Sequence, residues 1–173
     1  MNKILSVKKK AIVQRAIQFI GINIGGWEEF LLPTLTPHRV RDGKLFLGTL
    51  EGEQEVQKEE WLVEDVQRCV YPVYNDKFLE IYDFSDATVE NPYTKPISII
   101  RKDLGEIYKA CKFTGDLANC EFVKDNNFCT KIEGSRAYTS EDTYAEIGDI
   151  LITDGNYKWS CKEDIFHQTY EIL

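Results

Sequence analysis

The sequence repeats itself, and this repetition limits the folds that the chain can adopt. Residues 13–19 read Val-Gln-Arg-Ala-Ile-Gln-Phe and residues 107–113 read Ile-Tyr-Lys-Ala-Cys-Lys-Phe, with a glycine two positions later in each case. A second pair of similar segments, residues 71–82 and 159–170, closes each half. The offset falls from 94 residues at the first pair to 88 at the second, as loops of different length would produce. The sequence therefore predicts two copies of one small unit.

Each copy combines strand signals with a short helix signal. Residues 11–19, 45–50 and 61–64 are rich in β-branched and aromatic side chains, which favour strands. Trp27, Phe30 and Leu31 fit the apolar side of a short helix that ends before Pro33. We therefore predict an α+β fold of two tandem copies, each a small, mostly antiparallel sheet unit with one short helix.

Proline and turn signals predict the boundaries between these copies. We expect the first repeat unit at 1–84, a linker at 85–104 that carries Asn-Pro and Lys-Pro, and the second unit at 105–173. Residues 97–100 could add one strand to the linker. The Asp-Gly pair in residues 41–44 predicts a turn, and hairpin turns are predicted at residues 51–52 and 154–156.

Composition narrows the classes of partner. The 29 acidic residues outnumber the 21 basic ones, so the net charge is −8, which disfavours binding to DNA or to an anionic membrane. Such a surface suits solubility or a basic protein partner. One basic run, Lys8 to Lys10 near the N-terminus, is interpreted as an edge strand kept soluble by lysines.

Nothing in the sequence calls for a metal, a cofactor or a membrane. The five cysteines are odd in number and include no Cys-x-x-Cys pair, which predicts reduced thiols and no metal site. No stretch approaches the ~20 apolar residues of a membrane span, and the start of the chain is too short for a signal peptide. We expect a cytoplasmic protein without cofactors.

No segment forms a catalytic motif. His38 and His167 are the only histidines, and neither has a nucleophile or carboxylate partner at a suitable spacing. Residues 21–26 are rich in glycine but lack the lysine of a phosphate-binding loop, so we interpret them as a turn. We therefore predict that the chain is not an enzyme and assign no catalytic or metal-binding residue.

Two features remain as candidate binding elements. Strand alternation places Glu53 and Glu55 on one face, either as a solvated face or as negative charge offered to a basic partner, including as a phosphate mimic. Arg15 and Lys109 are the one basic pair that holds equivalent positions in the two copies, and this scarcity disfavours a nucleotide ligand, since phosphate recognition usually recruits arginine or lysine. The shared apolar positions, such as Phe78 and Phe166, are most simply interpreted as core, with a duplicated binding pocket as the alternative. Asp76 and Asp164 are expected to cap or bend the backbone before the closing segment.

The run at residues 9–21 resembles the opening of a small protein family common in phage and prophage genomes. That family opens with a basic patch, a valine-rich strand and an Ala-Ile-Gln-aromatic stretch. It ends with a Pro-Gly-Asp-aromatic turn and a Tyr-Pro-Cys-Lys-Pro-Asp-Ile-Phe close. Residues 148–150 and 161–166 are similar to that close, and in the first copy residues 49–52 and 71–72 match the middle and the end of the family unit. The turn proline is missing in both halves, and Glu59-Glu60 replaces Gly-Asp in the first.

The resemblance implies a tandem duplication of a viral or prophage unit to which no activity is assigned. From it we predict a non-enzymatic phage or prophage accessory protein that acts by binding in the host cytoplasm. The leading hypothesis is an anti-defence factor that blocks a host immune protein or sequesters a signalling nucleotide, with the protein partner favoured. The alternatives are a virion or morphogenesis component and, third, an enzyme that uses His38 and His167.

Overall fold

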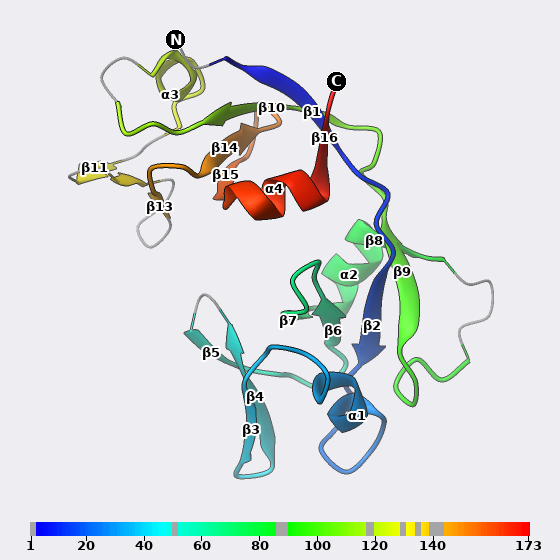
Figure 1. The fold of residues 1–173 in the computed structure, drawn as a ribbon. Helices are drawn as coiled ribbons and strands as arrows, with labels where there is room; N and C mark the ends of the chain where they lie inside the picture. The colour runs from blue at the N-terminus through cyan, green and yellow to red at the C-terminus, as the bar shows by residue number, and fades with distance from the viewer. Residues whose placement is uncertain are drawn as a thin grey trace. The chain divides into compact units, whose positions relative to one another are not determined.

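The computed structural model describes residues 3–49, 52–85, 90–116, 120–128, 131–133, 136–138 and 144–173. The chain forms two compact units (Figure 1). The contiguous unit comprises Ala11–Lys102, and the split unit comprises Met1–Lys10 together with Asp103–Leu173. The backbone therefore passes from one unit to the other twice, at residues 10–11 and at residues 102–103.

The contiguous unit contains a five-stranded antiparallel sheet in the order β7-β6-β2-β9-β8 and a three-stranded sheet in the order β3-β4-β5. Two short helices accompany these sheets. The elements are β2 (Gln14–Gln18), α1 (Trp27–Leu31), β3 (His38–Arg41), β4 (Lys44–Thr49), β5 (Gly52–Glu55), β6 (Trp61–Glu64), β7 (Val70–Val73), α2 (Asn75–Ile81), β8 (Tyr82–Phe84) and β9 (Ile97–Arg101).

The split unit has the same plan, with β15-β14-β10-β1-β16 as its large sheet and β11-β12-β13 as its small one. The N-terminal strand takes the place that β9 holds in the contiguous unit. The elements are β1 (Leu5–Lys9), β10 (Ile107–Lys112), α3 (Glu121–Asp125), β11 (Lys131–Glu133), β12 (Arg136–Tyr138), β13 (Tyr144–Ala145), β14 (Ile150–Thr153), β15 (Lys158–Cys161), α4 (Glu163–Thr169) and β16 (Tyr170–Ile172).

The two large sheets also agree in register. Arg101 of β9 lies opposite Tyr82 of β8, as Lys9 of β1 lies opposite Tyr170 of β16. The equivalence continues just beyond the strands. The ammonium groups of Lys10 and Lys102 donate to the carbonyls of His167 and Leu79, which hold matching positions in α4 and α2. The α+β class with mostly antiparallel sheet is thus confirmed.

Each large sheet is covered on both faces, so its strands alternate between two cores. In the contiguous unit Leu62 packs with residues of α1 and the small sheet, whereas Trp61 and Val63 pack with Phe78 of α2 on the other face. All four residues of β6 are consequently buried. In the split unit Leu151 likewise packs with residues of α3, and its neighbours Ile150 and Ile152 pack with Phe166 of α4.

A carboxylate closes the turn before β6 and the matching turn before β14. Glu60 Oε2 accepts a hydrogen bond from the backbone N–H of Gln57 at 2.7 Å, and Asp149 Oδ2 accepts one from that of Glu146 at 2.8 Å. Both carboxylates are buried, and each satisfies a backbone donor that would otherwise be unpaired. This turn is the Glu59-Glu60 and Gly148-Asp149 element noted in the sequence.

Three predictions were wrong. Among the described residues each unit has two short helices rather than one, because the segments that close the units form α2 and α4 before their final strands. Strand β1 is an interior strand, because it lies between β10 and β16 with Val7 fully buried. The helices α2 and α4 have no side-chain cap at Tyr74 or Lys162, since Asp76 and Asp164 lie two positions after these N-cap residues, in the first turn.

The predicted turn at residues 41–44 joins β3 and β4, and the predicted hairpin at residues 154–156 is confirmed as the turn between β14 and β15. The hairpin predicted at residues 51–52 lies partly outside the described residues. Residues 97–101 form β9, which completes the large sheet of the contiguous unit although it falls in the predicted linker. The repeat boundaries near 84 and 105 stay a prediction. Sequence similarity defines those boundaries, whereas contacts in space define the structural units.

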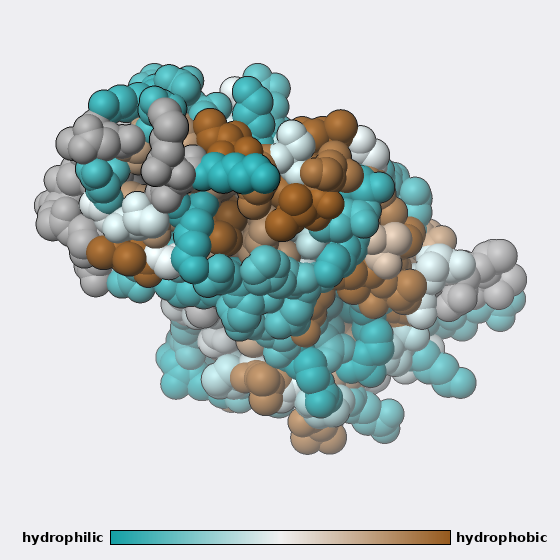
Figure 2. All heavy atoms as spheres, turned by 45° about the horizontal axis from the view of Figure 1, so that its top comes forward, coloured by the Kyte–Doolittle hydropathy of each residue, from teal (hydrophilic) through white to brown (hydrophobic). Residues whose placement is uncertain are grey.

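Most exposed hydrophobic side chains are scattered. Figure 2 shows them on one face as several separate groups among hydrophilic residues. In the split unit, exposed Ile4, Ile172 and Leu173 belong to or flank the paired strands β1 and β16. No helix in the described ranges is long and apolar enough to cross a membrane.

Candidate functional site

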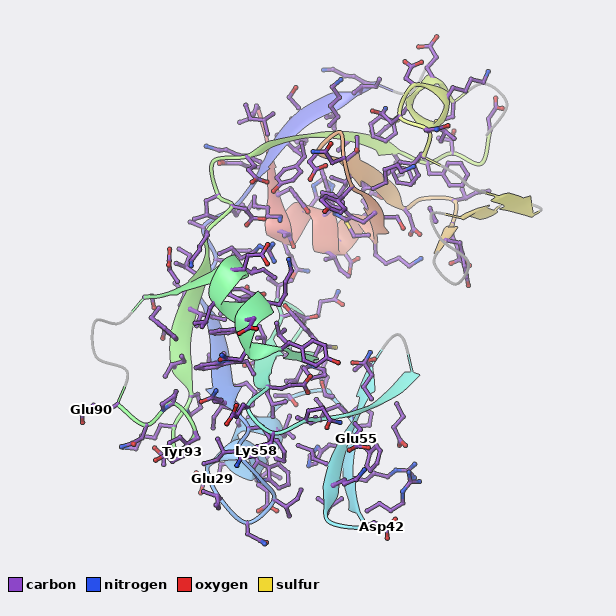
Figure 3. All side chains as sticks on the ribbon, turned by 180° about the vertical axis from the view of Figure 1, so that it is seen from behind. Glu29, Asp42, Glu55, Lys58, Glu90 and Tyr93 are labelled. Carbon is purple, nitrogen blue, oxygen red and sulfur yellow. The ribbon has the colours of Figure 1, made fainter. Side chains whose placement is uncertain are left out.

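The small sheet of the contiguous unit, β3-β4-β5, presents the candidate binding surface. The first hairpin turns at Asp42-Gly43, where both residues have positive φ, 52° and 73°, as a two-residue turn between twisted strands requires. Asp42 lies at the tip of this hairpin, and Glu55 lies on β5 (Figure 3). Because Leu45 and Leu47 are buried, the alternate residues of β4 point to the opposite, outer face.

Charged residues surround one aromatic ring on this outer face. Arg39 pairs with Glu53 at 2.7 Å, and Lys44 pairs with Glu55 at 2.9 Å. The guanidinium of Arg41 lies 4.7 Å from the ring centre of Phe46, within cation–π distance. We call these six residues, together with Gly48, the small-sheet face.

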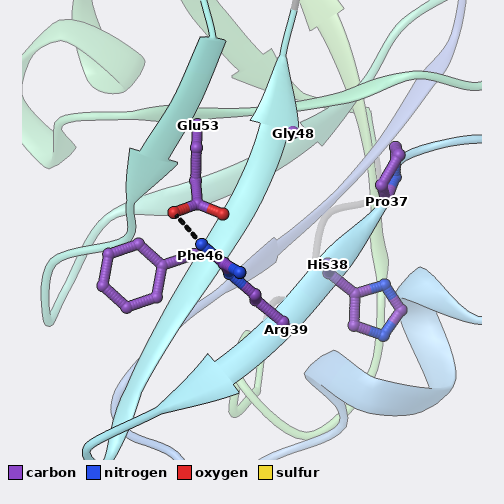
Figure 4. Close-up of a pocket in the computed structure, with 6 residues that line it drawn as sticks. All are labelled: Pro37, His38, Arg39, Phe46, Gly48 and Glu53. Atoms are coloured by element: carbon purple, nitrogen blue, oxygen red, sulfur yellow. Dashed lines mark hydrogen bonds and ion pairs between the residues drawn. The ribbon is translucent and has the colours of Figure 1, made fainter.

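A shallow pocket of about 130 Å³ lies on the small-sheet face (Figure 4). Its floor is Gly48, which has Pro37 beside it and Glu53 opposite it in the β4–β5 register. Arg39 reaches across β4 to Glu53 and forms one wall with the ring of Phe46. The pocket exists because Gly48 has no side chain, and its size suits one partner side chain.

The predicted acidic strand is therefore not a negative surface. Glu53 and Glu55 do share a face, as the alternation predicted, but each is neutralised by a cation from a neighbouring strand. The hydrogen bond from Lys44 is the largest cause that lowers the pKa of Glu55. With Arg41 as the third cation on these strands, the arrangement gives no support to a phosphate mimic.

The other candidate residues have structural roles. Arg15 donates to Glu64 through Nε at 2.6 Å and lies over the ring of Phe30, so its charge is used within the unit. A Cβ on Gly25 or Gly26 would come within 2.4 Å of the carbonyl oxygens of residues 93 and 94. The glycines at residues 25–26 are therefore required by a close backbone approach, as the turn interpretation anticipated.

The two histidines belong to different units. His38 Nδ1 lies 3.4 Å from the Thr36 carbonyl oxygen at the rim of the pocket, and the ring of His167 contacts Phe166 on α4. No described group of three or more His, Cys, Asp or Glu residues could hold a metal ion.

Burial raises the pKa of the Cys111 thiol to about 11 and that of Cys161 to about 12, which suppresses their thiolate forms at neutral pH.

Sequence reasoning missed Arg39, Arg41, Phe46 and Gly48 as surface residues. The available signal was the alternation of Lys44, Phe46 and Gly48 against Leu45 and Leu47, which places one aromatic and one glycine on the exposed side of a strand.

The chain matches no protein-family model, no curated protein and no solved structure.

Proposed function

We propose that the chain is a non-enzymatic binding protein and that the small-sheet face contacts a protein partner. The observation that carries this proposal is the pocket over Gly48, flanked by Phe46 and the Arg39–Glu53 pair. Aromatic and arginine side chains are enriched in protein interfaces, and interface anchors insert into small pockets of this kind. Its mixed charges suit a polar protein surface with one inserted side chain.

Pocket size favours a protein over a nucleotide as the ligand. Sites for small molecules typically enclose about 300–1,000 Å³, whereas this pocket measures about 130 Å³. Phosphate recognition usually recruits arginine or lysine, yet Arg15 is paired with Glu64 and Arg39 with Glu53. A nucleotide is accordingly the weaker candidate for this pocket.

We also propose that the chain arose by tandem duplication and acts as a phage or prophage anti-defence factor in the host cytoplasm. The matching strand order and register of the two large sheets support duplication. The resemblance of residues 9–21 and 161–166 to a phage and prophage family supports the origin. An acidic, non-catalytic protein that blocks a host immune protein fits these features, and a virion component is the alternative.

The test compares captured proteins between matched glycine variants. Gly48→Val fills the pocket, and Gly48→Ala places a methyl group 3.4 Å from Pro37, an ordinary contact that the fold tolerates. Gly105→Ala is the control, because no atom lies within 4 Å of its added Cβ. A host protein captured by the wild type and by Gly105→Ala should bind Gly48→Val at least about 10-fold more weakly, as loss of an anchor predicts.

A double substitution tests the same face through charge. Arg39→Glu with Glu53→Arg keeps an ion pair but exchanges the positions of its two charges. A partner that binds the small-sheet face should therefore no longer be captured. Equal capture by all variants would refute the small-sheet face as the interface. Presence of the chain in purified particles, with no host partner, would instead favour the virion component.

A further inference from the structure

Strand β1 is held entirely by the split unit, although the backbone attaches it to the contiguous unit. It pairs with β10 on one side and with β16 on the other. Val7 is fully buried in the same core as Tyr108, Phe166 and Tyr170. Every strand neighbour of β1 thus comes from residues 103–173, while its covalent continuation, residue 11, begins the other unit.

The end of β1 is fixed by charge as well as by packing. Lys9 forms an ion pair with Asp103, and its ammonium lies 5.0 Å from the ring centre of Tyr108. The Tyr108 hydroxyl lies 2.8 Å from a carboxylate oxygen of Glu106 and 3.2 Å from one of Asp103, so its single proton is donated to one or the other. We call the position between β10 and β16 the strand slot.

The exchange of strands is reciprocal. Strand β9 directly precedes β10 in the sequence, yet it pairs with β2 and β8 of the contiguous unit. Each half of the chain therefore donates its first strand to the sheet formed by the other half. This reciprocal strand pairing within one chain resembles the pairing in a domain-swapped dimer, in which each subunit donates one strand to the sheet of the other.

The tether explains why β1 does not fold back on β2. If β1 took the place of β9 beside β2, Val7 would lie opposite Gln14, by equivalence with the observed Ile99–Gln14 pair. Lys10 and Ala11 would then form a two-residue hairpin turn. Such turns need positive φ and favour glycine or asparagine, so Lys10-Ala11 disfavours the hairpin and keeps β1 available to a distant sheet.

We propose that the strand slot is a binding site for an extended segment and that β1 of a second copy of this chain can fill it. The occupant follows from continuity with the pairing already present, because a second copy offers the same Leu5, Val7 and Lys9 to the same neighbours. The contacts are identical in both forms, so the effective concentration of the tethered β1 sets the balance between monomer and exchanged dimer.

A complementation experiment tests the proposal. Val7→Glu damages the donor strand and leaves the slot intact, whereas Ala110→Glu damages the slot, where Ala110 lies opposite Leu5, and leaves β1 intact. Mixed at high concentration, the two full-length variants should form a 1:1 heterodimer by native mass spectrometry. Amide exchange of residues 107–112 in an isotope-labelled Val7→Glu copy should slow at least 10-fold on mixing.

The control replaces Val7→Glu with Val13→Glu, at an exposed position outside β1. That copy keeps its own strand in its own slot, so mixing should change nothing. Two separate monomers, or a complex without slower exchange at residues 107–112, would overturn the proposal. As a second measurement, a synthetic peptide of residues 1–12 should bind the Val7→Glu copy 1:1, and the same peptide carrying Val7→Glu should not; failure of the unmodified peptide to bind also overturns it.

Discussion

The contiguous and split units build one sheet plan from different side chains. Where the contiguous unit joins the hydroxyls of Tyr71 and Tyr82 at 2.9 Å, the split unit joins the indole N–H of Trp159 to the Tyr170 hydroxyl at 3.2 Å. The donor changes from a phenol to an indole, yet in both units the contact joins the two outermost strands of the large sheet, β7 and β8 or β15 and β16. Register and backbone geometry are therefore common to both units, and the chemistry that secures them varies.

The largest predicted effect is a loss of structure confined to the split unit. Deleting residues 1–10 should leave β10, β14 and β15 paired but free β16, because β1 is the link between β10 and β16, and should leave the contiguous unit unchanged. Hydrogen exchange read separately over residues 14–101 and 107–172 checks this. Lys8→Ala is the control, since its pair with Glu171 is about half exposed and should contribute at most about 0.5 kcal/mol.

The aromatic cores should differ in the cost of one equivalent truncation. Phe78 stacks on Trp61 with ring centres 4.0 Å apart and also contacts Tyr82, whereas Phe166 stacks on Tyr170 at 5.3 Å. Phe78→Ala should destabilise its unit by about 4 kcal/mol and Phe166→Ala by about 3 kcal/mol, as measured by denaturant unfolding. Exposed Leu79→Ala on α2 should cost far less, and a reversed order for the two phenylalanines would contradict the comparison.

Substitutions in the turn before β6 and in the matching turn before β14 should change the stability of the two units in opposite directions. Glu59 has φ of 74° where the split unit has Gly148 with φ of 98°. Glu59→Gly should stabilise the contiguous unit by about 0.5–1 kcal/mol, because glycine adopts positive φ without strain. Gly148→Ala should destabilise the split unit by about 1–2 kcal/mol, and no atom would contact the added methyl group. Thermal unfolding of both variants tests the pair, and effects of equal sign would refute it.

The smallest effect is a pH dependence at Glu60. Burial raises the pKa of Glu60 above its usual 4.5, against the lowering effect of the Gln57 backbone N–H. The folded state therefore binds this proton more tightly than the unfolded state, so it gains stability as the pH falls from 7 through the raised pKa. Glu60→Gln should lack this gain. The free energy of unfolding, measured by chemical denaturation at pH 7 and pH 4.5, should therefore change differently in the wild type and in Glu60→Gln, and an equal change in both would contradict the expectation.

Local elements were predictable because their signals are local. Strand β6 at Trp61–Glu64 matches the predicted residues, and Asp154-Gly155 forms the turn between β14 and β15 as predicted. The position of β1 was not predictable from its lysines, because Lys9 is satisfied by Asp103, far away in the sequence. The pairing of Glu53 with Arg39 was hidden for the same reason: it depends on cross-strand register, which a charge pattern along one strand does not contain.

The interior position of β1 has a consequence for synthesis on the ribosome. The contiguous unit can fold as soon as β9 has emerged, whereas β1, made first, must wait for β16 at Tyr170–Ile172. At about 5–20 residues per second this delay is on the order of 8 to 30 seconds. During that interval a strand carrying Leu5 and Val7 is without its sheet, and the neighbouring lysines keep it hydrated until its last partner is translated.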